Sequence, residues 1–135
     1  MGTFYVNCTI ESTVSPKKSV TIHKMLVDTG AEYSWIPEME LERVGIQPRK
    51  KDVAFIMANG TRITRDVGYA ILRVGEFETV DEVVFGREGD MKLLGARTME
   101  GFAAVIDPRQ KRLVAAGPLP VGSIMKRTPW ESDPI

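Results

Sequence analysis

The chain has 135 residues, of which 43% are hydrophobic and 27% charged, a composition typical of one globular domain with a single core. Its 18 basic and 18 acidic side chains give a formal net charge of zero, so neither nucleic acid nor a membrane surface is indicated as a partner. No apolar run is long enough to span a bilayer, and the N-terminus lacks a signal-peptide pattern, so we expect a cytoplasmic protein.

Alternating apolar and polar residues predict strands in the first part of the chain. Residues 3–10 alternate as a half-buried strand does, and residues 20–27 form a second strand that becomes apolar on both faces at its end. This second strand therefore enters the core immediately before Asp28. A short helix is predicted next, with Pro37 in its first turn and Gly45 as its C-terminal cap.

A hairpin is predicted in the middle of the chain. Residues 53–57 and 61–67 alternate, and Asn59-Gly60 between them is the strongest signal for a two-residue turn. The hydrophobic face of this hairpin thins towards its tip, so the hairpin could project from the body. The basic run 49–51 before it is expected to be a solvated loop.

The remaining elements are again mostly strands, so the predicted fold class is all-β with one or two short helices. Strands are expected at 69–74 and 77–85, followed by an apolar strand end that runs into Gly95, a short helix containing Met99 and Phe102, and closing strands at 104–106 and 113–116. Residues 1–117 form the expected domain, and 118–135, with four prolines, form a non-regular tail or arm.

The residue inventory excludes most catalytic systems. One histidine, His23, and one cysteine, Cys8, cannot supply a zinc site with three or four nitrogen and sulfur ligands. Cys8 falls on the apolar face of its strand and is expected to be a buried structural thiol, and His23 is expected at or near the surface. No phosphate-binding glycine loop or nucleophile elbow is present, so no cofactor or metal is expected.

Asp28 is the remaining candidate. A carboxylate at the end of a buried strand is costly unless other groups hold it, and by itself it would be read as a turn or capping aspartate. Two facing carboxylates can share one proton, so that one acts as a base while the other acts as an acid. Such a pair can activate a water molecule for attack on a peptide carbonyl, as in the aspartic proteases.

The stretch Val27-Asp28-Thr29-Gly30-Ala31 resembles the active-site loop of the retropepsin-like, single-domain aspartic proteases of the cellular and bacterial type. The resemblance extends over residues 3–117, because a second apolar-glycine site lies downstream, a hairpin lies between the two sites, and a short helix follows Gly95. It implies a closed β-barrel protomer with a flap hairpin, acting as an aspartic endopeptidase without cofactor.

The same resemblance implies a homodimer. The chain has one Asp-Thr-Gly, and Asp107 is followed by a proline and is better explained as a turn residue. The second carboxylate would then come from a second copy across a two-fold axis, and the terminal strands, 4–10 and 113–116, would interleave between subunits. The substrate would be an extended peptide or protein chain.

Residue roles follow as implications of the resemblance. Asp28 of each chain would hold the attacking water, Thr29 would donate its hydroxyl across the axis, Gly30 would contact substrate backbone, and Ala31 would stay small at the cleft floor. The flap tip would comprise Met57, Ala58, Asn59, Gly60 and Thr61, and the site packed beneath the loop would comprise Leu93, Leu94 and Gly95.

Two questions stay open at this level. Glu32 could pair with Arg97, although Ala96 separates that arginine from Gly95. The alternative to a protease is a retropepsin-like dimer that binds peptides or serves as a scaffold with little or no turnover.

Overall fold

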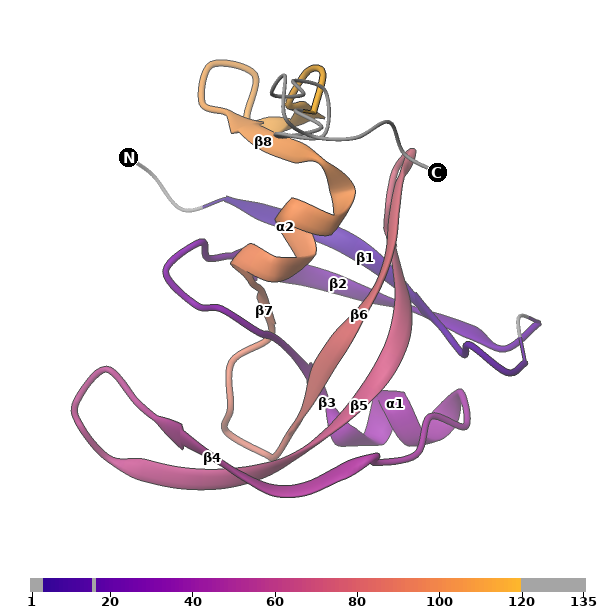
Figure 1. Cartoon of the computed structure of the whole chain (residues 1–135). Helices are drawn as coiled ribbons and strands as arrows, with labels where there is room; N and C mark the ends of the chain where they lie inside the picture. Colours follow the sequence, from indigo (N-terminus) through magenta and orange to yellow (C-terminus); the bar gives the residue numbers. More distant parts are fainter. Residues whose placement is uncertain (1–3, 16, 120–135) are drawn as a thin grey trace, which may run out of the picture.

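The computed structural model describes residues 4–15 and 17–119 (Figure 1). This part of the chain forms strands and two short helices, in the order β1 (Tyr5–Glu11), β2 (Ser19–Val27), β3 (Ser34–Pro37), α1 (Glu38–Arg43), β4 (Lys50–Ile56), β5 (Arg62–Val74), β6 (Phe77–Gly86), β7 (Leu93–Leu94), α2 (Ala96–Phe102), β8 (Ala104–Asp107) and β9 (Arg112–Ala115). The prediction of a mostly β fold with few short helices is confirmed.

The main sheet closes on itself. Its strand order is β1-β2-β7-β3-β6-β5-β4, and β1 also pairs with β5 through Thr9↔Arg73, Ile10↔Leu72 and Glu11↔Ile71. The ring from β1 to β5 is therefore a closed barrel, as predicted, and β4 attaches outside it along the first half of β5. Because β5 is long, it takes part both in the barrel and in the hairpin that extends from it (Figure 1).

The core lies inside this barrel and under α2. Apolar side chains from β1, β2, β3, β5 and β6 fill it, and Met99 and Phe102 of α2 close one end. The helix lies against β6 so closely that a Cβ at Gly101 would sit 2.3 Å from the hydroxyl oxygen of Thr79. Glycine, which weakens the helix by propensity, is thus the residue that allows this packing.

Two predictions about the first third of the chain need correction. Residues Ser34–Pro37 form a strand, β3, that pairs in parallel with β6, and Pro37 is the residue before α1 rather than part of its first turn. The basic run is not a loop, because β4 begins at Lys50. The short segment 34–37 gave no alternation from which a strand could be recognised.

Two predictions about the hairpin were also wrong. The strands are joined by residues 57–61 rather than by a two-residue turn, since Ile56 pairs with Arg62. Asn59 does not adopt the positive φ that such a turn requires, and only Gly60 does (φ 87°). The returning strand also continues through Gly68 instead of ending at Val67. Glycine fits there because a Cβ would lie 2.9 Å from the ring of Phe85 and 2.9 Å from the carbonyl oxygen of Gln47.

The expected positions of Cys8 and His23 are confirmed, since Cys8 is buried and His23 is exposed. Phe102 and Trp35 are also buried, and Trp35 belongs to the cluster beneath the hairpin. The predicted tail, 118–135, lies outside the described residues except for its first two. Among the residues that the structure describes, neither helix is long and apolar enough to cross a membrane.

Candidate active site

The loop that carries Asp28 is held by its backbone. Strand β2 ends at the buried Val27, whose amide donates to the carbonyl of Phe4 (2.8 Å). The amide of Asp28 donates to the carbonyl of Leu94 (2.9 Å), and the amide of Ala31 donates back to the carbonyl of Asp28 (3.1 Å). Residues 28–31 therefore form a tight turn at the edge of the core.

The carboxylate of Asp28 is directed by its own loop. Its Oδ1 accepts a hydrogen bond from the amide of Gly30 (2.9 Å), which is the one hydrogen bond to this carboxylate among the described residues. Asp28 is partly exposed, and Thr29 and Gly30 are exposed. The loop thus presents an oriented carboxylate at the surface, where a second molecule can reach it.

The site at 93–95 lies directly against this loop. Strand β7 pairs in parallel with β2, matching Leu26 with Leu93 and Val27 with Leu94. The next two amides continue the contact, since Ala96 donates to the carbonyl of Ala31 (2.8 Å) and Arg97 to that of Glu32 (3.1 Å). The two glycine-containing segments that the sequence singled out are therefore brought together.

Gly95 is packed against the backbone of the loop. A Cβ there would lie 2.4 Å from the carbonyl oxygen of Tyr33 and 2.8 Å from that of Glu32. Both are closer than any real carbon–oxygen contact, and both partners are backbone atoms that no rotamer change can move. Only glycine allows β7 and the loop to approach this closely.

The hairpin tip is exposed and ordered by short-range bonds. Residues 57–61 are all exposed. The amide of Met57 donates to the carbonyl of Thr61 (2.8 Å), and that of Gly60 to the carbonyl of Met57 (2.9 Å). The amide of Thr61 donates to Oδ1 of Asn59 (2.9 Å). The tip is a defined turn that no other part of the described chain covers.

Aromatic packing connects the hairpin to the segment that follows the Asp28 loop. The ring of Phe55 in β4 meets the ring of Tyr33 edge-on, with centroids 5.6 Å apart, and that of Trp35 at 5.2 Å. These rings belong to a second small hydrophobic cluster beneath the hairpin. The hairpin base and the loop thus share one packing surface.

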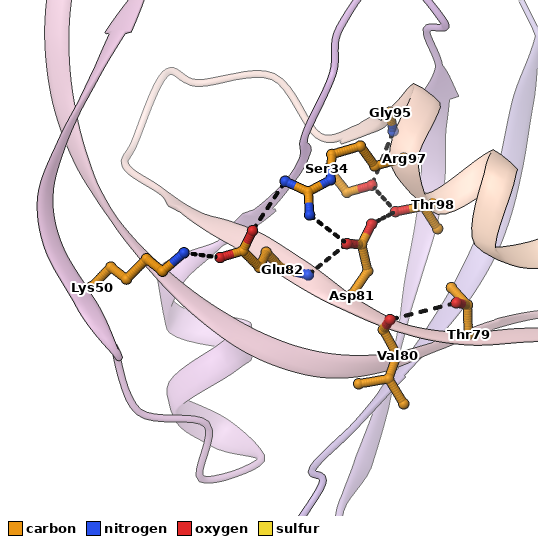
Figure 2. A network of polar contacts seen from close by, with 9 residues as sticks. All are labelled: Ser34, Lys50, Thr79, Val80, Asp81, Glu82, Gly95, Arg97 and Thr98. Carbon is orange, nitrogen blue, oxygen red and sulfur yellow. Dashed lines mark hydrogen bonds and ion pairs between the residues drawn. The ribbon is translucent and has the colours of Figure 1, made fainter. Parts of the chain in front are cut away.

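A chain of polar groups lies behind Gly95 (Figure 2). The Gly95 amide donates to Oγ of Ser34 (2.9 Å), Oγ of Ser34 and Oγ1 of Thr98 are 2.6 Å apart, and Thr98 donates to Oδ2 of Asp81 (2.8 Å). Ser34 and Thr98 are fully buried. The sequence interpretation did not single out these residues, and the one signal for Ser34 was a hydroxyl next to the apolar pair Trp35-Ile36.

The possible Glu32–Arg97 ion pair is not formed. The guanidinium of Arg97 instead lies 3.0 Å from Oε2 of Glu82 and 4.0 Å from Oδ1 of Asp81, and 4.8 Å from the ring centre of Tyr33 (Figure 2). Lys50 of β4 also contacts Glu82, and its hydrogen bond holds the pKa of that carboxyl below the ordinary value. Arg97 follows Ala96 into α2, which turns its side chain towards β6.

The described residues offer no metal site, because no three of their His, Cys, Asp and Glu side chains cluster. Burial also raises the pKa of the Cys8 thiol to about 12, which leaves it protonated and poorly nucleophilic. Asp107 accepts hydrogen bonds from the amides of Arg109 (2.9 Å) and Gln110 (3.3 Å), as a turn residue does. Of the candidate groups, the carboxylate of Asp28 has the exposure and orientation for chemistry.

Comparison with known proteins gives one family. A family model described as gag-polyprotein putative aspartyl protease matches residues 18–100. Among solved structures, the retroviral protease-like domain of Ddi1 from Leishmania major is similar with a TM-score of 0.58 and 18% identity, covering 90% of this chain and 98% of that one. Among curated protein sequences, none is detectably similar to this chain.

A second solved structure is more distant. A foamy viral protease-reverse transcriptase in complex with double-stranded DNA matches with a TM-score of 0.46 and 18% identity, covering 70% of this chain and 15% of that one. The likeness to the Ddi1 domain establishes a retropepsin-like fold for the chain.

Proposed function

Since the chain belongs to the family of gag-polyprotein putative aspartyl proteases, we propose that it is an aspartic endopeptidase whose active site forms when two chains meet. The observation that carries the proposal is the geometry of Asp28. Its backbone is fixed by Leu94, its carboxylate is oriented by the Gly30 amide, and its surroundings are open. This arrangement leaves the carboxylate of Asp28 fixed in direction and open to contact with a second carboxylate.

The proposed reaction needs two carboxyl groups that share one proton. The ionised Asp28 takes a proton from a water molecule, whose oxygen forms a bond to the carbonyl carbon of the peptide, while the protonated Asp28 of the second chain gives its proton to the carbonyl oxygen. The nitrogen of the tetrahedral intermediate then takes the proton from one carboxyl group as the carbon–nitrogen bond breaks, and one hydroxyl of the intermediate returns its proton to the other carboxylate, so that the pair ends with one proton again. No oxidant, metal or cofactor is required for this balance.

A second copy of the chain supplies the second carboxylate in this proposal. Asp107 cannot serve, because its side chain is engaged in a turn and lies on the separate β8–β9 sheet. The partly exposed Asp28, the exposed Thr29 and Gly30, and the exposed Tyr5 near the start of β1 are consistent with a two-fold interface that pairs the loops and the terminal strands. Thr29 would then brace the paired loops with its hydroxyl.

The hairpin is the proposed flap. Its exposed tip, Met57 to Thr61, would close over an extended peptide and exclude water, while its base stays packed on Tyr33. A peptide held between the flap and the paired loops would present its side chains alternately to either side. The substrate class is therefore an unfolded or extended polypeptide segment.

Peptide cleavage from acidic to neutral pH tests the proposal. We expect the purified protein to cleave peptides and Asp28→Asn to lose at least about 1000-fold in kcat, because the pair then lacks its ionisable base. Asp107→Asn is the matched control, since an asparagine can accept the same turn hydrogen bonds, and we expect it to retain activity. Equal activity of the wild type and Asp28→Asn would refute the assignment.

A heterodimer tests the shared site. One wild-type chain and one Asp28→Asn chain carrying different tags can be co-expressed and purified together, and sedimentation confirms the assembly. We expect this heterodimer to be as inactive as the Asp28→Asn homodimer, because each site needs both carboxylates. Half of the wild-type activity in the heterodimer would show that each chain works alone. A wild-type homodimer that cleaves no peptide would favour the peptide-binding module.

A further inference from the structure

The structure contains a support for the Asp28 loop that lies outside the Asp-Thr-Gly stretch. We propose that the hydroxyl chain from Gly95 through Ser34 and Thr98 to Asp81 positions the loop that carries Asp28, with Asp81 as the residue that sets its direction. The catalytic consequence of this inference rests on the proposed function, but the positioning itself does not.

The direction of this chain follows from its ends. The amide of Gly95 can only donate, so Ser34 accepts from it, and a carboxylate only accepts, so Thr98 donates to Asp81. The proton between the two hydroxyls must therefore belong to Ser34, which donates to Thr98 across 2.6 Å. Each group then has its partners only if all hydrogen bonds run from Gly95 towards Asp81.

Burial makes this direction costly to change. Ser34 and Thr98 have no exposed surface, and the side chain of Asp81 is 10% exposed, so water cannot replace a lost partner at either hydroxyl. The second oxygen of Asp81 is also occupied, because Oδ1 accepts the amide of Glu82 (2.7 Å). The Thr98 hydroxyl and the Glu82 amide thus each donate to one oxygen of the Asp81 carboxylate. An asparagine of the same shape has one acceptor oxygen and cannot accept both hydrogen bonds.

The hydrogen-bond chain begins at Gly95, which lies between the two residues whose backbone bonds to the Asp28 loop. Gly95 follows Leu94, whose carbonyl receives the Asp28 amide, and it precedes Ala96, whose amide bonds to Ala31. A shift of Gly95 would therefore move both backbone contacts of the loop. Because a displacement of about 1 Å at a reacting group can reduce a rate by about 100-fold, small shifts here matter for the proposed reaction.

The Asp81→Asn substitution keeps the size of the side chain but does not allow all the hydrogen bonds to keep their direction. If the amide oxygen keeps the bond to Glu82, the amide nitrogen faces Thr98, which must then turn its proton to Ser34 and leave the proton of Ser34 without an acceptor. If the amide is flipped, its nitrogen faces the amide of Glu82, so two donors meet. Either arrangement leaves one buried group unpaired.

Thr98 provides a matched pair of variants. Thr98→Val keeps the shape and removes the hydroxyl, whereas Thr98→Ser keeps the hydroxyl and loses only a methyl group. Glu78→Gln is the control, because it also removes a carboxylate from β6, the strand of Asp81. Glu78 pairs with Arg73 at the surface and takes no part in the hydrogen bonds from Gly95 to Asp81.

Kinetics on the full chain test the catalytic consequence, at a temperature at which every variant is folded. We expect Asp81→Asn and Thr98→Val to lose about 10- to 100-fold in kcat, with little change in KM, while Thr98→Ser and Glu78→Gln stay within about threefold of wild type. Because a smaller folded fraction would also lower the apparent kcat at unchanged KM, kcat is expressed per folded molecule, with the folded fraction taken from urea unfolding of each variant, and Thr98→Ser shows whether a hydroxyl at this position restores it. Wild-type kcat in Asp81→Asn would overturn the inference, and this variant carries the test if Thr98→Val does not fold.

Amide hydrogen exchange tests the positioning independently of activity. We expect the amides of Gly95 and Asp28 to exchange at least about tenfold faster in Asp81→Asn than in Glu78→Gln, with the amides of β6 other than that of Glu82 unchanged, since the Glu82 amide itself bonds to the side chain of Asp81. If the wild type cleaves no peptide, the proposed function fails while this measurement still decides the positioning role. Unchanged exchange at Gly95 and Asp28 would overturn it.

Discussion

Replacement of Gly95 by alanine tests how closely β7 must approach the Asp28 loop. The backbone at Gly95 has φ −92° and ψ 178°, a conformation that alanine adopts without strain. Any effect of the added methyl group must therefore come from its contacts. Its Cβ would meet the carbonyl oxygens of Tyr33 at 2.4 Å and Glu32 at 2.8 Å.

The size of the required movement can be worked out from these distances. An ordinary contact begins at 3.4 Å, so the carbonyl of Tyr33 must retreat by 3.4 − 2.4 = 1.0 Å. The backbone hydrogen bonds from Ala96 to Ala31 and from Arg97 to Glu32 lie next to this contact and would lengthen. We expect Gly95→Ala to lower the free energy of unfolding by about 1–3 kcal/mol, the usual cost of overpacking, and to reduce kcat by about 100-fold.

Urea unfolding measures the stability. It can be followed by tryptophan fluorescence, because Trp35 pairs with Leu93 of β7. Peptide cleavage measures kcat. Gly101→Ala is the comparison, because its clash is with a side chain and can be removed by a second substitution. An unfolding midpoint and slope equal to those of the wild type in Gly95→Ala would refute the steric reasoning.

Three further predictions concern other parts of the fold. Gly101→Ala places a Cβ 2.3 Å from the Thr79 hydroxyl and should destabilise the protein by about 1–3 kcal/mol, and adding Thr79→Ala should restore most of this in urea unfolding; a double variant no more stable than Gly101→Ala contradicts the contact. The hydrogen bonds from Arg65 hold the pKa of Asp90 below its ordinary value, so their contribution is complete above the unfolded pKa of about 4 and is lost as the pH falls through the folded pKa. Asp90→Asn should thus be less stable than wild type by about 1–3 kcal/mol at pH 6, with the difference shrinking below pH 4, and a constant difference across this range would be the contrary result. Cys8, fully buried with a pKa of about 12, should resist a thiol reagent at pH 8 in the native protein and react on unfolding in urea; rapid reaction without urea would contradict its burial.

The fold was largely predictable because its strands alternate and its turns carry glycine or proline. The closed barrel, however, came from the family resemblance, since no local pattern shows that β1 pairs with β5. Strand β3 was missed because four residues are too few for periodicity, and two strands, 61–67 and 69–74, were predicted where β5 is continuous, because the contact of Gly68 with Phe85 of the neighbouring strand leaves no local pattern. Tertiary packing decided these positions, and local propensity did not.

The two halves of the candidate site were recognisable for a related reason. Both β2 and β7 run as apolar residues into a segment that ends in glycine, and such segments are unusual enough to be read from the sequence. Their direct contact, with the Asp28 amide on the Leu94 carbonyl, then follows from the parallel pairing of the two strand ends.

The polar support behind them could not be read in this way. Ser34, Asp81 and Thr98 lie on three elements that are far apart in the chain, and each is an ordinary residue for its own element. What distinguishes them is that the side chains of Ser34, Thr98 and Asp81 bond to one another, and that the two hydroxyls lie where water does not reach. Such a chain of hydroxyls tolerates one direction of hydrogen bonding, so it fixes Gly95, and through Leu94 the amide of Asp28, more strictly than apolar packing would. The exact position of the Asp28 carboxylate would then depend on residues that take no part in the proposed reaction.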